Sequence, residues 1–162
     1  MKLNKEPKLR IETKMMCNAI VEIDNPYLQA WADTGAIVML TGGDFWILTG
    51  LGQLLLKIHD ESMHLECIAV RSDERRQGKG GTLMKYVVEI SDETGIPVTL
   101  QVDDVSNGNM MTMPHPVVGV GQDKKNKIPV GSLTKWYEKF GFKKTDSYTT
   151  KKRSMIYTPK AK

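Results

Sequence analysis

The strongest chemical signal in the sequence is a glycine-rich segment with three cations: Arg75, Arg76, Gln77, Gly78, Lys79, Gly80 and Gly81. It stands between an apolar, strand-like run at 65–70 and an amphipathic helical pattern that starts near Thr82. A strand, a tight turn and a new helix N-terminus direct unpaired backbone N–H groups and a partial positive charge at one point. Glycines let the backbone approach a phosphate closely, and the cations add mobile charge around it. The segment therefore predicts an anion site for a phosphate-bearing cofactor.

An antiparallel meander is expected before this segment. Asn25 and Pro26 predict a helix that begins with an asparagine cap and ends at Gly35. Four extended runs follow, separated by turn residues rich in Gly, Asp and Ser. They are 36–40, 45–49, 53–59 and 64–71. Short connections of this kind join neighbouring antiparallel strands.

After the glycine segment the pattern changes to strand–helix–strand. Apolar residues at helical spacing predict a helix from Thr82 to Gly95, and a strand follows at 98–102 that returns parallel to the 64–71 strand. A second helix is capped by Ser132 and closed by Gly141, and two strands, from Phe142 and at 153–157, end the chain. We therefore expect one α/β (α+β) domain over 1–162, with a mixed, mostly antiparallel twisted sheet of about six to seven strands. The stretch 103–131 has no periodicity, and we interpret it as an insertion or lid.

Composition limits the classes of function. The 162 residues are 40% hydrophobic, which suits a single core, and no apolar run is long enough for a membrane span or a secretory signal. Cys17, Cys67 and the three histidines lack metal-ligand spacing, so we expect reduced thiols, no metal and a cytoplasmic protein. The basic ends, 1–14 and 151–162, flank a body of net charge −4. Short lysine-bearing ends are usually solvated, so a nucleic-acid partner is not expected.

Two motifs resemble the Gcn5-related N-acetyltransferase (GNAT) family. Arg75, Gly78 and Gly80 match its pyrophosphate pattern Arg/Gln-x-x-Gly-x-Gly/Ala, and 136–142 resembles its aromatic-Tyr-Glu-Lys-x-Gly-Phe segment. The resemblance covers about 36–158 and implies an acyl-CoA N-acyltransferase fold with acetyl-CoA as co-substrate. In that fold the fourth strand separates from the fifth in a V-shaped splay. An asparagine that the family often places shortly before its tyrosine is replaced here by Val130.

The resemblance implies a cofactor site built mostly from backbone. The pantetheine arm would lie along Ile68 and Val70 like an added strand, and the amide of Ile68 or Ala69 would polarise the thioester carbonyl. The pyrophosphate would rest on N–H groups from Arg76 to Gly81. The cofactor-binding residues predicted in this way are Ile68, Ala69, Val70, Arg75, Arg76, Gln77, Gly78, Lys79, Gly80, Gly81 and Thr82.

Three side chains are candidates for catalysis. By resemblance the Tyr137 hydroxyl would protonate the departing thiolate, whereas the helical pattern alone describes an ordinary core tyrosine. His64 and Glu66 flank Leu65 on one strand and so share a face, where the family often places a base. Either could instead be structural, Glu66 in a salt bridge and His64 in a solvated turn. Strand alternation puts Cys67 opposite Glu66, as a small core residue rather than a nucleophile.

The predicted function is transfer of an acetyl group from acetyl-CoA to a primary amine by direct attack in a ternary complex. The acidic body favours a cationic acceptor. The alternatives are an acyl-CoA-binding sensor or docking module without turnover and an acetyltransferase directed at RNA or DNA. The sequence is compatible with a monomer or a homodimer.

Overall fold

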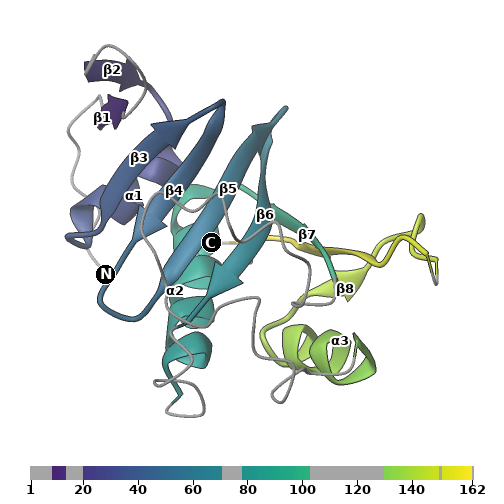
Figure 1. The fold of residues 1–162 in the computed structure, drawn as a ribbon. Helices are drawn as coiled ribbons and strands as arrows, with labels where there is room; N and C mark the ends of the chain where they lie inside the picture. The colour runs from purple at the N-terminus through teal and green to yellow at the C-terminus, as the bar shows by residue number, and fades with distance from the viewer. Residues whose placement is uncertain (1–8, 14–19, 71–77, 103–129, 150, 162) are drawn as a thin grey trace.

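The structure is a computed structural model that describes residues 9–13, 20–70, 78–102, 130–149 and 151–161. Within these ranges the chain forms one nine-stranded sheet in the order β2-β1-β3-β4-β5-β6-β7-β9-β8. The strands are β1 (Leu9–Thr13), β2 (Ile20–Ile23), β3 (Ile37–Thr41), β4 (Asp44–Leu48), β5 (Gln53–His59), β6 (Ser62–Ala69), β7 (Val98–Gln101), β8 (Lys143–Lys144) and β9 (Ser154–Tyr157). The helices are α1 (Pro26–Asp33), α2 (Lys79–Thr94) and α3 (Val130–Lys139), and Figure 1 shows α2 running behind the centre of the sheet.

The topology confirms the predicted fold class. Only β1–β3 and β6–β7 pair in parallel among the described strands, and all other neighbours are antiparallel. The strands β3 to β9 correspond to the predicted set of six to seven. The extra two are β1 and β2, and β1 lies inside the segment 1–14 that we expected to be a solvated tail. That expectation was wrong for Leu9–Thr13, because this segment pairs with both β2 and β3.

Helix α1 forms as its sequence predicts. The Asn25 side chain accepts a hydrogen bond from the Leu28 N–H at 3.1 Å, and Pro26 occupies the first helical position. One face carries four buried residues, Tyr27, Leu28, Ala30 and Trp31. The Tyr27 hydroxyl donates to the Val87 carbonyl of α2 at 3.1 Å, and burial raises the pKa of this phenol. Helices α1 and α2 are therefore joined on one side of the sheet.

Helix α2 begins three residues before the predicted start. It starts at Lys79 rather than Thr82, because the Thr82 N–H already bonds the Gly78 carbonyl at 3.0 Å. It ends as expected, with Gly95 at φ +73° and its N–H bonded to the Ser91 carbonyl. Gly80 and Gly81 of the predicted anion loop thus lie in the first turn of the helix, and Gly78 is its N-cap.

Several other predicted boundaries moved by one to three residues. Helix α3 starts at Val130, so Ser132 lies inside the helix and does not cap it. Strand β6 starts at Ser62 and ends at Ala69, two residues before both predicted limits. Asp60 adopts φ +52°, which lets a two-residue turn replace the predicted turn of three.

The main core lies between the sheet and helices α1 and α2, with side chains from α3 and the β9 end added. Its largest fully buried members include Trp31, Tyr27, Phe142, Leu28 and Ile47. Met39 and Trp46 are also buried but belong to a separate set outside this cluster. In the described residues no helix is long and apolar enough to cross a membrane, and no group of three or more ligating side chains could hold a metal.

Candidate functional site

The centre of the sheet carries one irregularity, a β-bulge in β6. Leu56 pairs with Leu65, but the next residue back, Leu55, pairs with Cys67. Glu66 is therefore an extra residue on β6 with no partner of its own on β5 in the register. Bulges of this kind change the twist of a strand and change where its side chains point.

Strands β6 and β7 separate just after the bulge begins. Their parallel register contains only three pairs, Met63 with Val98, His64 with Thr99 and Leu65 with Leu100. Strand β6 continues to Ala69 along β5, whereas the end of β7 stays with β9, since the Val102 N–H bonds the Arg153 carbonyl at 2.9 Å. The predicted splay lies between the fourth expected strand, 64–71, and the fifth, 98–102. It is thus present between β6 and β7.

The bulge also decides which backbone groups face the separation. The Met63 N–H bonds the Pro97 carbonyl next to β7, so odd-numbered residues before the bulge direct their N–H toward the β7 side. One inserted residue shifts this alternation by one. After Glu66 the even-numbered residues, Ile68 and Val70, direct their backbone toward the β7 side. These are the two residues whose backbone was predicted to meet the pantetheine arm.

The end of β6 is held close to the β4–β5 turn. A Cβ added to Gly52 would lie 2.5 Å from the Ala69 carbonyl oxygen, so only glycine allows this approach. Gly52 itself has φ +155°. Strand β6 therefore stays next to β5 up to Ala69, while its register with β7 ends at Leu65.

The N-terminus of α2 lies next to the end of β6. Its N-cap is Gly78 in the left-handed conformation, φ +76°, and this cap has no side chain to bond the first amides. Helix geometry gives the first-turn N–H groups of Gly80 and Gly81 no acceptor within the helix. The Thr82 hydroxyl donates back to the Gly78 carbonyl at 3.0 Å. The backbone, more than the threonine side chain, is thus the part of this turn suited to an anion.

Helix α3 borders this turn through two aromatic rings. A Cβ added to Gly80 would lie 3.7 Å from Val70 Cγ2 and 3.8 Å from Trp136 Cζ2, and one added to Gly81 would lie 3.8 Å from Phe140 Cζ. These are ordinary van der Waals separations. The turn is therefore enclosed by the end of β6 on one side and by α3 on the other, with room for a methyl group but little more.

His64 and Glu66 lie where β6 leaves β7. His64 is half-buried, and its Nδ1 lies 2.9 Å from the Oγ1 of Thr99 on β7. Glu66 is exposed overall, but its carboxyl is partly desolvated. This partial burial first, and then the charge of Asp44, raise the pKa of the carboxyl, against a smaller opposite effect of Lys57. The charge of Asp44 on β4 thus acts on Glu66 on β6 across the intervening strand β5.

Cys67 corrects one prediction. Simple alternation put it opposite Glu66, but the bulge places Cys67 in register with Leu55, on the side of the sheet away from the Leu54 and Leu56 core face. Burial, and then the charge of Glu66, raise the pKa of the Cys67 thiol to about 12. A thiol with that pKa is protonated at neutral pH and is a poor nucleophile.

Tyr137 lies on α3, half-buried in a row of aromatic rings. Its ring centroid is 5.1 Å from that of Trp136 and 6.0 Å from that of Phe142, and Phe142 lies 5.6 Å from Tyr157. The structure therefore puts Tyr137 on the helix that borders the α2 turn. Packing explains the position of the ring, and the role of its hydroxyl stays a prediction.

Some predicted residues lie outside the described chain, and two residues near the candidate site were not predicted. Arg75, Arg76 and Gln77, together with 103–129, lie outside the described residues. Thr99 was missed, because its contact with His64 depends on the parallel register across a long crossover and no local motif signals it. Asp44 was missed for the same reason, since only strand pairing brings it near Glu66.

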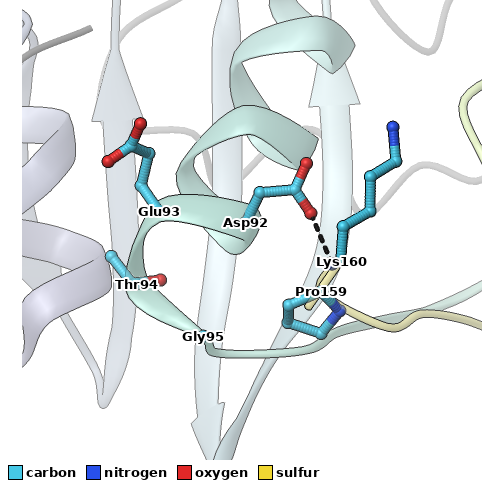
Figure 2. A pocket seen from close by; sticks show the side chains of 6 residues that line it. All are labelled: Asp92, Glu93, Thr94, Gly95, Pro159 and Lys160. Carbon is cyan, nitrogen blue, oxygen red and sulfur yellow. Dashed lines mark hydrogen bonds between the residues drawn. The ribbon is translucent and has the colours of Figure 1, made fainter. Parts of the chain in front are cut away.

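A surface pocket of about 460 Å³ lies elsewhere, at the C-terminal end of α2. Asp92, Glu93, Thr94, Gly95, Pro159 and Lys160 line it (Figure 2). Asp92 Oδ1 accepts hydrogen bonds from the Tyr157 hydroxyl and the Lys160 N–H, both at 2.8 Å. Burial and the neighbouring Asp92 raise the pKa of Tyr157 to about 12. These contacts attach the C-terminal segment to α2 and have no part in the arrangement at β6 and β7.

A comparison with protein families decides the relationship. Residues 11–112 match the family described as the acetyltransferase (GNAT) family, a range that contains β6, the bulge and the whole of α2. The chain belongs to the GNAT acetyltransferase family. No curated protein sequence matches it significantly.

Several solved structures are similar to this GNAT protein, all at low identity. The anti-CRISPR protein AcrVA5 is 21% identical, covers 72% of this chain and 99% of its own length, and has a TM-score of 0.49. The ribosomal-protein-S18-alanine N-acetyltransferase from Escherichia coli is 18% identical, and the match covers 76% of this chain and 74% of that protein, with a TM-score of 0.45. An aminoglycoside 6′-N-acetyltransferase complexed with coenzyme A is 16% identical, and the match covers 75% of this chain and 77% of that protein, with a TM-score of 0.47.

Proposed function

We propose that the protein transfers an acetyl group from acetyl-CoA to a primary amine by direct attack in a ternary complex. The observation that carries this proposal is the juxtaposition of the β6–β7 separation with the glycine-capped start of α2. The first exposes strand backbone toward a gap in the pairing, and the second presents helix amides a few residues later. Together with membership of the acetyltransferase family, this arrangement supports acetyl-CoA as the donor.

Each part of the cofactor has a matching part of the chain. The pantetheine arm would pair with the backbone of Ile68 and Val70, and the amide of Ile68 or Ala69 would stabilise the developing oxyanion. The pyrophosphate would bind the α2 amides, with Arg75, Arg76 and Lys79 adding charge and the segment from Gln77 to Thr82 supplying the turn.

In the reaction, the amine nitrogen forms a bond to the thioester carbonyl carbon and the carbon–sulfur bond breaks. His64 or Glu66 takes the proton that the nitrogen loses, and the Tyr137 hydroxyl gives a proton to the departing sulfur. A tyrosine suits the second role because it is normally protonated at neutral pH. The raised pKa of Cys67 supports direct attack over an acetylated cysteine intermediate.

The acceptor is proposed to be cationic. The described residues of the central part, 24–70 and 78–102, carry a net charge of −6, and Glu66 lies where β6 leaves β7, with the charge of Asp44 acting on it across β5. Opposite charge raises the local concentration of a substrate. A lysine side chain, a polyamine or another amine-rich molecule fits this description. A cytoplasmic location and a single domain stay predictions.

The test is a screen of amines and peptides for acetyl-CoA-dependent thiol release, with mass spectrometry to locate the new acetyl group. We expect at least one cationic amine to gain 42 Da, a mass fixed by the chemistry of acetylation, and the reaction to stop on removal of acetyl-CoA. Tight binding of acetyl-CoA without turnover on any amine would favour the binding module over the enzyme.

A further inference from the structure

One side-chain hydrogen bond crosses the two strands at the place where they separate. His64 Nδ1 and Thr99 Oγ1 are 2.9 Å apart, and both side chains are half-buried. The two residues are direct register partners, and only one further pair, Leu65 with Leu100, follows before the strands diverge. The imidazole is therefore fixed at the narrow end of the separation.

The position of the ring on the sheet is also defined. Met63 and Leu65 are buried in the core on the helix side, so His64, between them, faces the opposite side of β6. Its register partners there are Lys57 on β5 and Thr99 on β7, and Thr99 in turn pairs with Ile156 on β9. A substrate amine that approaches from the face opposite α1 and α2 would meet this row.

We propose that Thr99 is a positioning residue that fixes the tautomer of His64, accepting a hydrogen bond from Nδ1–H so that the lone pair is on Nε2. The contact between the two side chains is in the structure, and its direction is inferred from the proposed function. It selects His64, rather than Glu66, as the group that takes the proton from the amine. Thr99 touches neither substrate nor cofactor and acts only through the ring.

The direction of this hydrogen bond follows from what proton transfer requires. A neutral imidazole has one N–H and one lone pair, and both nitrogens are donors once it is protonated. If Thr99 Oγ1 accepts from Nδ1–H, the same bond persists in both states, and Nε2 can take a proton without any rearrangement. If Thr99 donated to Nδ1 instead, protonation of Nδ1 would break the bond, and Nε2 would already carry its hydrogen. Only the first arrangement leaves the ring ready to act as a base.

Charged groups of both signs lie on the strands around His64. Glu66 follows on the same strand, Lys57 faces the ring from β5, and Asp44 acts on Glu66 from β4. From β7 and β9 the register supplies only uncharged residues, Thr99 and Ile156. The Glu66 carboxylate would favour the imidazolium that forms when the amine nitrogen passes its proton to Nε2, and the Lys57 ammonium would oppose it. The nitrogen then completes its bond to the acetyl carbon as sulfur leaves.

The direct test is the nitrogen NMR spectrum of the unliganded full chain, labelled with ¹⁵N-histidine and assigned with His64→Gln. A protonated ring nitrogen and one with a lone pair resonate far apart, so the spectrum reports the tautomer without any need for activity. For neutral His64 we expect hydrogen on Nδ1 in the wild type and in Thr99→Ser. Thr99→Val, which keeps the shape but removes the acceptor, should give a mixture or the opposite tautomer. Hydrogen on Nε2 in the wild type would overturn the inference.

Kinetics then separates positioning from packing. We expect Thr99→Val to lower kcat about 10-fold with the KM for acetyl-CoA within about threefold, and Thr99→Ser to restore most of the rate. Thr94→Val is the matched control, because Thr94 donates its hydroxyl to the Ile90 carbonyl at the far end of α2. Equal rates for Thr99→Val and the wild type would remove Thr99 from the mechanism. If no amine is acetylated at all, the proposed function fails, and the NMR result still decides the role of Thr99.

Discussion

The strand pairs β4–β5 and β6–β7 are neighbours in one sheet, but their registers differ in length and regularity. Strand β4 pairs with β5 in an unbroken antiparallel register, and its side chains Phe45, Trp46 and Ile47 are buried. Strand β6 carries a bulge and keeps only three parallel pairs with β7. In the first pair the backbone is satisfied within the sheet, and the side chains contribute the stability. In the second pair the register ends at Leu65 and Leu100, and this is where we propose that the cofactor binds the β6 backbone.

The difference follows from the connections. A short glycine-containing turn joins β4 to β5 and fixes their register locally. The β6–β7 crossover contains all of α2, and that helix must start close to the end of β6 if its amides are to lie beside the exposed strand backbone. The separation and the helix start therefore form one unit. The following changes should affect either the regular pair or the irregular one, but not both.

The largest effect is expected from the regular pair. Ile47→Ala removes a fully buried side chain of β4 and should lower the free energy of unfolding by about 2–5 kcal/mol. Ile58→Ala, at 38% exposure on β5, is the matched control and should have a much smaller effect. Urea denaturation measures both. Similar losses for the two variants would contradict the assignment of the core to this face of β4.

Tyr137→Phe should act on chemistry and leave the fold almost unchanged. Loss of a general acid at sulfur should lower kcat by about 10²-fold or less, with the affinity for CoA within about fivefold. Steady-state kinetics and calorimetry with CoA are the measurements. Unchanged turnover, with the chemical step shown to limit the rate, would leave Tyr137 only its packing role between Trp136 and Phe142.

Substitutions at Gly80 should separate space from charge in the α2 turn. Gly80→Asp places a carboxylate near the proposed pyrophosphate and should weaken CoA binding by about 10-fold or more. Gly80→Ala should keep the affinity within about threefold, because its methyl group would make only ordinary contacts with Val70 and Trp136. Gly80→Asn has the size of aspartate without the charge, so it is the matched control and should weaken binding less than Gly80→Asp. Calorimetry compares the three variants. Wild-type affinity for the aspartate variant would exclude this turn as the pyrophosphate site.

The smallest expected effect is a change in thermal stability at Glu66, the extra residue of the β6 bulge. Burial and Asp44 raise the pKa of Glu66, so its ionisation is less favourable in the folded chain than in the unfolded one. The contribution of Glu66 to stability therefore falls as the pH rises through its pKa. Glu66→Gln should have a slightly higher Tm than the wild type at pH 7, with the difference shrinking toward about pH 4, near the ordinary pKa of glutamate.

Melting curves from pH 4 to pH 8 test this expectation. Glu61→Gln removes the same charge in the β5–β6 turn, away from Asp44, and serves as the control for overall charge. A lower Tm of Glu66→Gln at neutral pH would mean that folding stabilises the carboxylate, which is the opposite of a raised pKa.

Local signals in the sequence were enough for most of the fold. Asn25 and Pro26 start α1, Gly95 ends α2, and the turn residues separate β4, β5 and β6 nearly where expected. Errors arose where pairing outweighed composition. Basic residues suggested a free end, but Leu9–Thr13 pairs with two strands.

The candidate site was predictable only in part, because it depends on register. The glycine turn was recognised from its spacing. The bulge changes the alternation by a single residue, and no residue type marks it. It turns the Cys67 side chain to the face away from the core and the Ile68 backbone toward the β7 side. The contact between His64 and Thr99 likewise exists only because the crossover returns β7 in one particular register.

The most direct test of the central claim is a crystal structure of the chain with bound acetyl-CoA. We expect the pantetheine arm between β6 and β7, hydrogen-bonded to the backbone of Ile68, and the pyrophosphate on the amides from Lys79 to Gly81. Regular pairing of β6 with β7 beyond Leu65, or a cofactor bound at another part of the surface, would contradict the claim.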